Sequence, residues 1–178
     1  MTVSPRLTKF ALTVHVVTSV GWLGAVITFL VLAIVGLSSN DSQRVRAAYL
    51  AMDLTGWYVL VPLSLASPLS GAVQSLGTRW GLFRHYWVVA KLVMTIPATL
   101  VLLLHMRPIS HIAGIAGTTE LSSTGLGQLR MQLMVNAAAA LLVLLATTAL
   151  SIYKPKGLTP YGWRKADEER VRYTGFVE

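Results

Sequence analysis

The stretch FALTVHVVTSVGWLGAVITFLVLAIVGL, which runs from Phe10 to Leu37, contains no Asp, Glu, Lys or Arg. As an α-helix rising about 1.5 Å per residue, it exceeds the roughly 30 Å hydrocarbon core of a membrane. We do not expect it to be a cleaved signal peptide, because the apolar region of such a peptide has only about 7–15 residues. The stretch therefore predicts a first transmembrane helix over about 10–37.

Three further runs of low charge follow, and they predict helices over about 54–76, 85–106 and 131–153. Lys91 is the one charged residue in these runs. Of the 178 residues, 54% are hydrophobic and 12% are charged, whereas globular proteins average about 25% charged residues. We expect an all-α, integral membrane four-helix bundle over 1–153, in contact with lipid and self-associating. A polar cytoplasmic tail follows over 154–178.

Lysine and arginine are distributed unequally between the two sides of this bundle. Eleven belong to the side that carries both chain ends and the middle loop, and four belong to the other side. The eleven are Arg6, Lys9, Arg79, Arg84, Lys91, Lys154, Lys156, Arg164, Lys165, Arg170 and Arg172, and the four are Arg44, Arg46, Arg107 and Arg130. Because loops rich in Lys and Arg stay in the cytoplasm, we expect both termini to be cytoplasmic in a bacterial inner membrane that the chain crosses several times. Anionic lipid headgroups then explain the net charge of +8, and we expect no nucleic-acid partner.

Composition and motifs exclude several kinds of site. The chain has no cysteine, which removes disulfides, thiolate metal sites and covalently attached c-type haem. No P-loop, Ser-His-Asp set or pair of intramembrane carboxylates occurs in the sequence. Any chemistry must therefore come from the few polar residues within the apolar runs.

Two of these residues are nitrogen bases at matched depth. His15 lies six residues past Lys9, and Lys91 lies seven residues past Arg84. Ionisable groups at membrane depth usually face the bundle interior. A neutral histidine bonded to a carbonyl would explain His15 without any ligand, and a lysine that reaches back to the headgroups would explain Lys91. Both alternatives remain open at the level of the sequence.

The matched depth predicts a site for b-type haem. His15 and Lys91 could bind the iron from opposite faces of the porphyrin, since burial favours the neutral amine of a lysine. A lysine of this kind could also transfer protons, which makes Lys91 the candidate catalytic residue. Arg84, with Lys9 and Arg79, could hold the carboxylates of the haem. Small residues flank Trp22 and could make room for a macrocycle, although close helix packing explains them equally well.

A second candidate metal site lies near the opposite side of the membrane. His105 lies at the end of the third apolar run and His111 follows it, and imidazole combined with the thioether of nearby Met106 suits copper. A methionine side chain, however, more commonly fills space in the hydrophobic core than binds a metal. Copper binding or transfer, or a membrane scaffold without a cofactor, are therefore the alternatives to a haem protein.

Two motifs resemble known bacterial membrane families. The stretch His15-Val-Val-Thr-Ser-Val-Gly-Trp-Leu-Gly-Ala25 resembles the first helix of HemJ-type protoporphyrinogen oxidases and of the copper-resistance protein D family. Trp87-Val-Val-Ala-Lys-Leu92 resembles the start of the third helix of the HemJ type, and 81–92 resembles an uncharacterised family of four-span proteins. The HemJ resemblance implies that His15 and Lys91 bind b-haem in a redox protein that exchanges electrons with a quinone or a porphyrin. After Trp22, however, the sequence departs from the aromatic, proline and arginine segment of that family.

Overall fold

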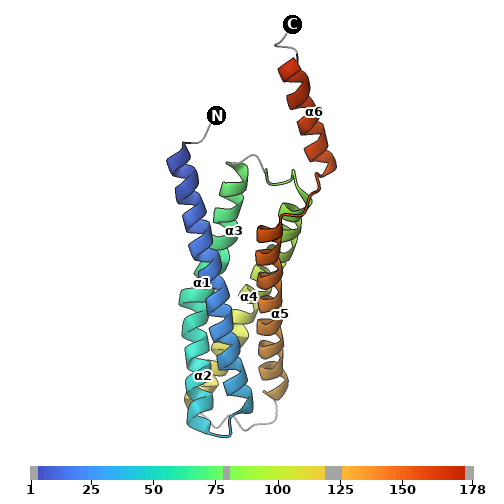
Figure 1. Cartoon of the computed structure of the whole chain (residues 1–178). Helices are drawn as coiled ribbons and strands as arrows, with labels where there is room; N and C mark the ends of the chain where they lie inside the picture. Colours follow the sequence, from blue (N-terminus) through green and yellow to red (C-terminus); the bar gives the residue numbers. More distant parts are fainter. Residues whose placement is uncertain (1–3, 78–80, 119–125, 175–178) are drawn as a thin grey trace.

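The computed structural model describes residues 4–77, 81–118 and 126–174, which are helical almost throughout. The elements are α1 (Pro5–Ser38), α2 (Ser42–Thr55), the π-helical turn η1 (Gly56–Leu60), α3 (Val61–Leu76), α4 (Tyr86–Thr118), α5 (Gly127–Tyr153) and α6 (Pro160–Thr174). α2, η1 and α3 form one continuous rod, which packs against α1 and α4. α5 packs on the same two helices, and α6 projects from one end (Figure 1). We refer to the end where α1 begins and α6 lies as the inner end, and to the opposite end as the outer end.

Four of these helical segments are long and apolar enough to cross a membrane. They are Pro5–Ser38, Ser42–Leu76, Tyr86–Ile115 and Gly127–Tyr153. Large apolar side chains such as Leu69, Leu104 and Leu142 point outward and are about two-thirds exposed or more, which a water-soluble surface would not tolerate over such an area. The expected all-α chain with four apolar helices is confirmed.

The second and third of these helices are longer than the sequence predicted. The second begins at Ser42 because Asp41 caps it, with Oδ1 accepting the backbone N–H of Gln43 at 2.9 Å. Asp53, at which we expected the helix to start, is accommodated inside it because Ser110 Oγ donates a hydrogen bond to its carboxylate at 2.6 Å. The expected ranges 54–76 and 85–106 therefore follow the apolar residues and miss the more polar continuations of both helices.

Proline explains the widened turn between α2 and α3. The N–H of Val61 bonds to the carbonyl of Gly56, five residues back, so the turn is a π-helix. This extra width relieves the clash that Pro62 would make with the preceding turn of a regular helix. Gly56 also permits close packing, since a β-carbon there would lie 2.6 Å from Met106 Cε.

The core is densest at the outer end. Tyr49, Met52, Met106 and Ile112 are essentially fully buried there. Arg130, at the start of α5, donates to the Tyr49 hydroxyl at 2.9 Å and to the carbonyl of Gly36 at the end of α1. This tight packing contrasts with the inner end, where the helices enclose a cavity.

The chain after α5 folds back onto the loop before α4. Thr159 is buried, its hydroxyl donates to the Phe83 carbonyl at 2.6 Å, and its backbone N–H donates to the Arg84 carbonyl at 3.1 Å. The same hydroxyl accepts the N–H of Gly162 at 3.0 Å and so caps the start of α6. The tail that the sequence described only as polar is thus a helix fixed to the bundle at its base.

Candidate functional site

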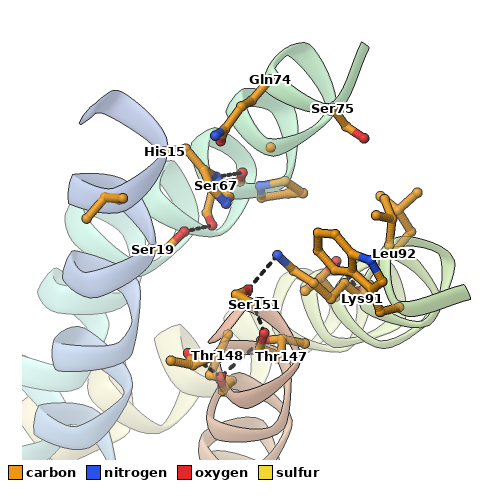
Figure 2. A pocket seen from close by; sticks show the side chains of 18 of the residues that line it. His15, Ser19, Ser67, Gln74, Ser75, Lys91, Leu92, Thr147, Thr148 and Ser151 are labelled. Carbon is orange, nitrogen blue, oxygen red and sulfur yellow. Dashed lines mark hydrogen bonds between the residues drawn. The ribbon is translucent and has the colours of Figure 1, made fainter. Parts of the chain in front are cut away.

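A cavity of about 410 Å³ lies at the inner end of the bundle. Its walls come from α1, α3, α4 and α5, and they include both His15 and Lys91. Figure 2 shows His15 beside Ser67 on one side of the cavity and Lys91 extending toward Ser151 on the other. The two residues that the sequence placed at one depth therefore face the same space.

The ring of His15 is fixed by α3. Its Nδ1 lies 3.1 Å from the carbonyl oxygen of Ser67 and 3.2 Å from Ser70 Oγ. A carbonyl can only accept, so Nδ1 carries the proton and Nε2 is the nitrogen with the lone pair. Nε2 has no hydrogen-bond partner among the described residues. The imidazole also packs on the backbone of Gly71, where a β-carbon would lie 2.8 Å from Cε1.

The side chain of Lys91 is held by a residue of α5. Its Nζ donates a hydrogen bond to Ser151 Oγ at 2.7 Å, and Ser151 donates in turn to the carbonyl of Thr147 at 2.8 Å (Figure 2). The Nζ atom also lies 5.7 Å from the centroid of the Trp87 ring. All of these partners are neutral, and the described residues provide Lys91 with no carboxylate within ion-pair distance.

Trp22 contributes a polar atom without a partner. The side chain lines the cavity and is only 2% exposed, yet its Nε1 donates to no other atom of the described residues. Buried polar groups in native structures nearly always have a partner. Trp22 lies seven residues beyond His15, about 10 Å further along α1. It therefore offers a hydrogen-bond donor at the end of the cavity nearer the middle of the bundle.

Arg84 does not line the cavity. Its guanidinium pairs with both carboxylate oxygens of Glu169 on α6, at 3.1 and 2.7 Å. The hydrogen bonds from Arg84 lower the pKa of Glu169, and the same bonds raise the pKa of Arg84. Lys9 is not among the lining residues either, and Arg79 lies outside the described residues.

Lys154, which the sequence interpretation treated only as a topology signal, lines the cavity instead. It follows the last residue of α5 and has a left-handed backbone conformation, with φ of 42°. Its position as the first cation after the fourth apolar run was visible in the sequence. Its approach to the cavity depends on how the chain leaves α5, which the sequence pattern does not reveal.

The two histidines of the alternative copper site lie apart, and His105 is already bonded at both ring nitrogens. His105 Nδ1 donates to the Val101 carbonyl at 2.7 Å, and His105 Nε2 accepts from Asn136 Nδ2 at 2.7 Å. His111 is exposed and lies six residues further along α4, on another face of the helix. Within the described residues, no three or more His, Cys, Asp or Glu side chains come together as a metal site would require. The geometry offers copper no prepared set of ligands.

Comparisons with known proteins do not add to this picture: no family model, curated protein or solved structure matches the chain. A functional proposal for the chain therefore rests on the geometry of the inner cavity.

Proposed function

We propose that the chain is a b-haem-binding protein of a bacterial inner membrane, in which His15 would bind the iron. The observation that carries the proposal is that the His15 imidazole donates its proton from Nδ1, so that Nε2 has the lone pair. Ser67 accepts the Nδ1 proton, as a carbonyl commonly does for a histidine that binds a metal. The Nε2 lone pair then remains available at the cavity.

The other lining residues are chemically suited to such a group. The cavity volume falls within the range of about 300–1,000 Å³ typical of ligand pockets. Lys91 faces the same space with an amine that can bind iron when neutral, and Lys154 supplies a cation for a carboxylate. Trp22 and Trp87 provide flat aromatic surfaces. Haem would supply one-electron chemistry at this position.

Other residues of the chain would orient the imidazole, hold a proton and exclude water. Ser67 orients the imidazole through Nδ1. Lys91 can release a proton or take one up at Nζ, and its bond to Ser151 fixes where that proton is held. Apolar residues such as Val16 and Leu144 exclude water from the site. We propose a quinone or a porphyrin as the electron partner, since both could reach the cavity within the membrane.

The proposal is tested by the absorption spectrum of the purified protein from cells supplied with haem. We expect a Soret band for the wild type and its loss or a clear shift in His15→Ala, with the variant still folded in detergent. His105→Ala is the matched control and should keep the wild-type spectrum, because both ring nitrogens of His105 are already bonded. Wild-type protein without porphyrin would overturn the proposal and leave a cofactor-free scaffold.

A further inference from the structure

The indole of Trp22 is buried beside the inner cavity without a hydrogen-bond partner. Its side chain is 2% exposed, and Nε1 bonds to no atom of the described residues. An indole Nε1 can only donate, and leaving a buried donor unpaired costs free energy. We therefore expect an acceptor at this position, and the cavity that Trp22 lines is the space from which it can come.

Several hydroxyl groups of the same lining are engaged with the protein itself. Thr147 and Thr148 each donate to a carbonyl of their own helix, α5, at 3.0 and 2.8 Å. Ser19 on α1 is bonded to Ser67 on α3 at 2.8 Å. Because no atom of the described residues accepts the indole proton, the acceptor must belong to a water or to a bound molecule.

The position of Trp22 limits the kind of molecule that can reach it. Trp22 lies near the middle of the 34 residues of α1, which is long and apolar enough to cross a membrane. The middle of a spanning helix is about 15 Å from either edge of the hydrocarbon core. Phospholipid ester carbonyls stay with the headgroups at those edges. The acceptor is therefore carried by a molecule that dissolves within the hydrocarbon.

The walls of the cavity also reach the lipid-facing surface of the bundle. Leu12 and Val16 on α1 line the cavity and are about half exposed, and Ile152 on α5 lines it and is largely exposed. Side chains that line a cavity and are also exposed mark where it approaches the surface. Because all three are apolar, an uncharged and lipid-soluble molecule can enter between them from the side.

We propose that the inner cavity binds the head of a lipid-soluble quinone, with one carbonyl oxygen accepting the hydrogen bond of Trp22 Nε1. A quinone head is flat and uncharged and carries carbonyl acceptors, which suits a buried donor in a largely apolar wall. The choice of a quinone among carbonyl compounds rests on the proposed redox function. Trp22 lies about 10 Å further along α1 than His15, so this contact does not require Nε2 of the imidazole.

The test uses the full-length protein, purified in a nonionic detergent from cells supplied with haem. The probes are decylubiquinone and decylbenzene, which has no carbonyl group, and their affinities are measured by titration calorimetry. Trp22→Phe keeps an aromatic ring and removes the donor. We expect this variant to bind decylubiquinone about fivefold more weakly, because one hydrogen bond is lost. The affinity for decylbenzene should be unchanged, which separates the lost donor from lost packing.

Infrared spectra of decylubiquinone labelled at its carbonyl carbons give a second readout. We expect one carbonyl band of the bound quinone to shift to lower frequency in the wild type and to return in Trp22→Phe. Trp57→Phe is the matched control, because Trp57 lies outside the cavity lining and its Nε1 already donates to Ser110 Oγ at 3.0 Å. This variant should keep the wild-type affinity and spectrum.

An unshifted carbonyl band in the wild type would overturn the inference, whatever Trp22→Phe does to folding. Equal affinity of Trp22→Phe and Trp57→Phe for decylubiquinone would also overturn it and leave a water as the partner of the indole. Displacement of the quinone by an equal concentration of diacylglycerol would identify an ester as the ligand and overturn the choice of a quinone.

The outcomes also distinguish this inference from the proposed function. A haem spectrum in a protein that does not bind decylubiquinone would overturn the quinone site and leave the iron ligand intact. Binding of decylubiquinone through Trp22 in a protein that never acquires haem would support the quinone site and overturn the haem proposal.

Discussion

Lys91 can act at the cavity in two ways, and arginine distinguishes them. A structural anchor needs only a long cationic side chain that can donate to Ser151. An iron ligand or a proton carrier must lose its charge within the membrane, and arginine cannot do so. We therefore expect Lys91→Arg to resemble Lys91→Met, with a changed absorption spectrum and a changed midpoint potential.

The control for this comparison is Lys156→Arg, since Lys156 is exposed beyond the end of α5 and should be insensitive to the exchange. Spectra and potentials that are unchanged in both Lys91 variants would show that the amine has no part in the site. His15 would then need another partner across the cavity.

At the scale of single residues, the sequence predicted the depth of His15 and Lys91 but not their hydrogen-bond partners. Counting from Lys9 and Arg84 was enough to place His15 and Lys91 at one depth, because a helix rises by a fixed amount per residue. Their hydrogen bonds join helices that are far apart in the sequence: His15 to Ser67 and Lys91 to Ser151. Arg84 was expected to hold the carboxylates of a haem, but its guanidinium pairs with Glu169.

At the scale of elements, charged residues showed where the apolar stretches end, but they did not show where the helices end. Asp41 begins a helix because a carboxylate can cap it, whereas Asp53 lies inside the same rod and is satisfied by Ser110. The continuation of α4 to Thr118 similarly passes Arg107 and Pro108. A capping residue can be recognised from the local sequence. A hydrogen bond from a residue of another helix, such as the one that Ser110 donates to Asp53, cannot.

The contact of α6 with the bundle should depend on pH in a defined direction. Arg84 lowers the pKa of Glu169, so the ion pair is complete above the ordinary glutamate value of about 4.3 and is lost only as the pH falls through the lowered value. A site-resolved NMR titration of the Glu169 carboxyl should give a midpoint below that of a free glutamate.

Arg84→Gln should raise that midpoint toward the ordinary value, while Lys156→Gln should leave it unchanged. An ordinary midpoint in the wild type would show that the pair does not form in solution. Because Glu169 is exposed, the pair fixes the direction of α6 more than it stabilises the fold.

At the scale of the whole molecule, the cations are divided between the two ends of the bundle. Lys9 near the start of α1, Arg84 before α4 and Lys154 after α5 lie at the inner end, where α6 also projects (Figure 1). Arg44 and Arg130 begin helices at the outer end.

The orientation can be measured directly because the chain has no cysteine. Single cysteines at Asn40, between α1 and α2, and at Lys156, after α5, should react with a membrane-impermeant maleimide from opposite sides. In intact cells we expect labelling of Asn40→Cys and none of Lys156→Cys until the membrane is permeabilised. The reverse pattern would place His15 and the cavity near the outer face of the membrane.

The assignment of His15 as an iron ligand is tested most directly by chemical rescue. His15→Ala opens space at the cavity wall, and free imidazole can occupy that space and offer the same nitrogen to the iron. We expect the wild-type protein to show the Soret band of bound haem, His15→Ala to lose or shift it, and added imidazole to restore it. A His15→Ala variant with the wild-type spectrum before any imidazole is added would contradict the assignment.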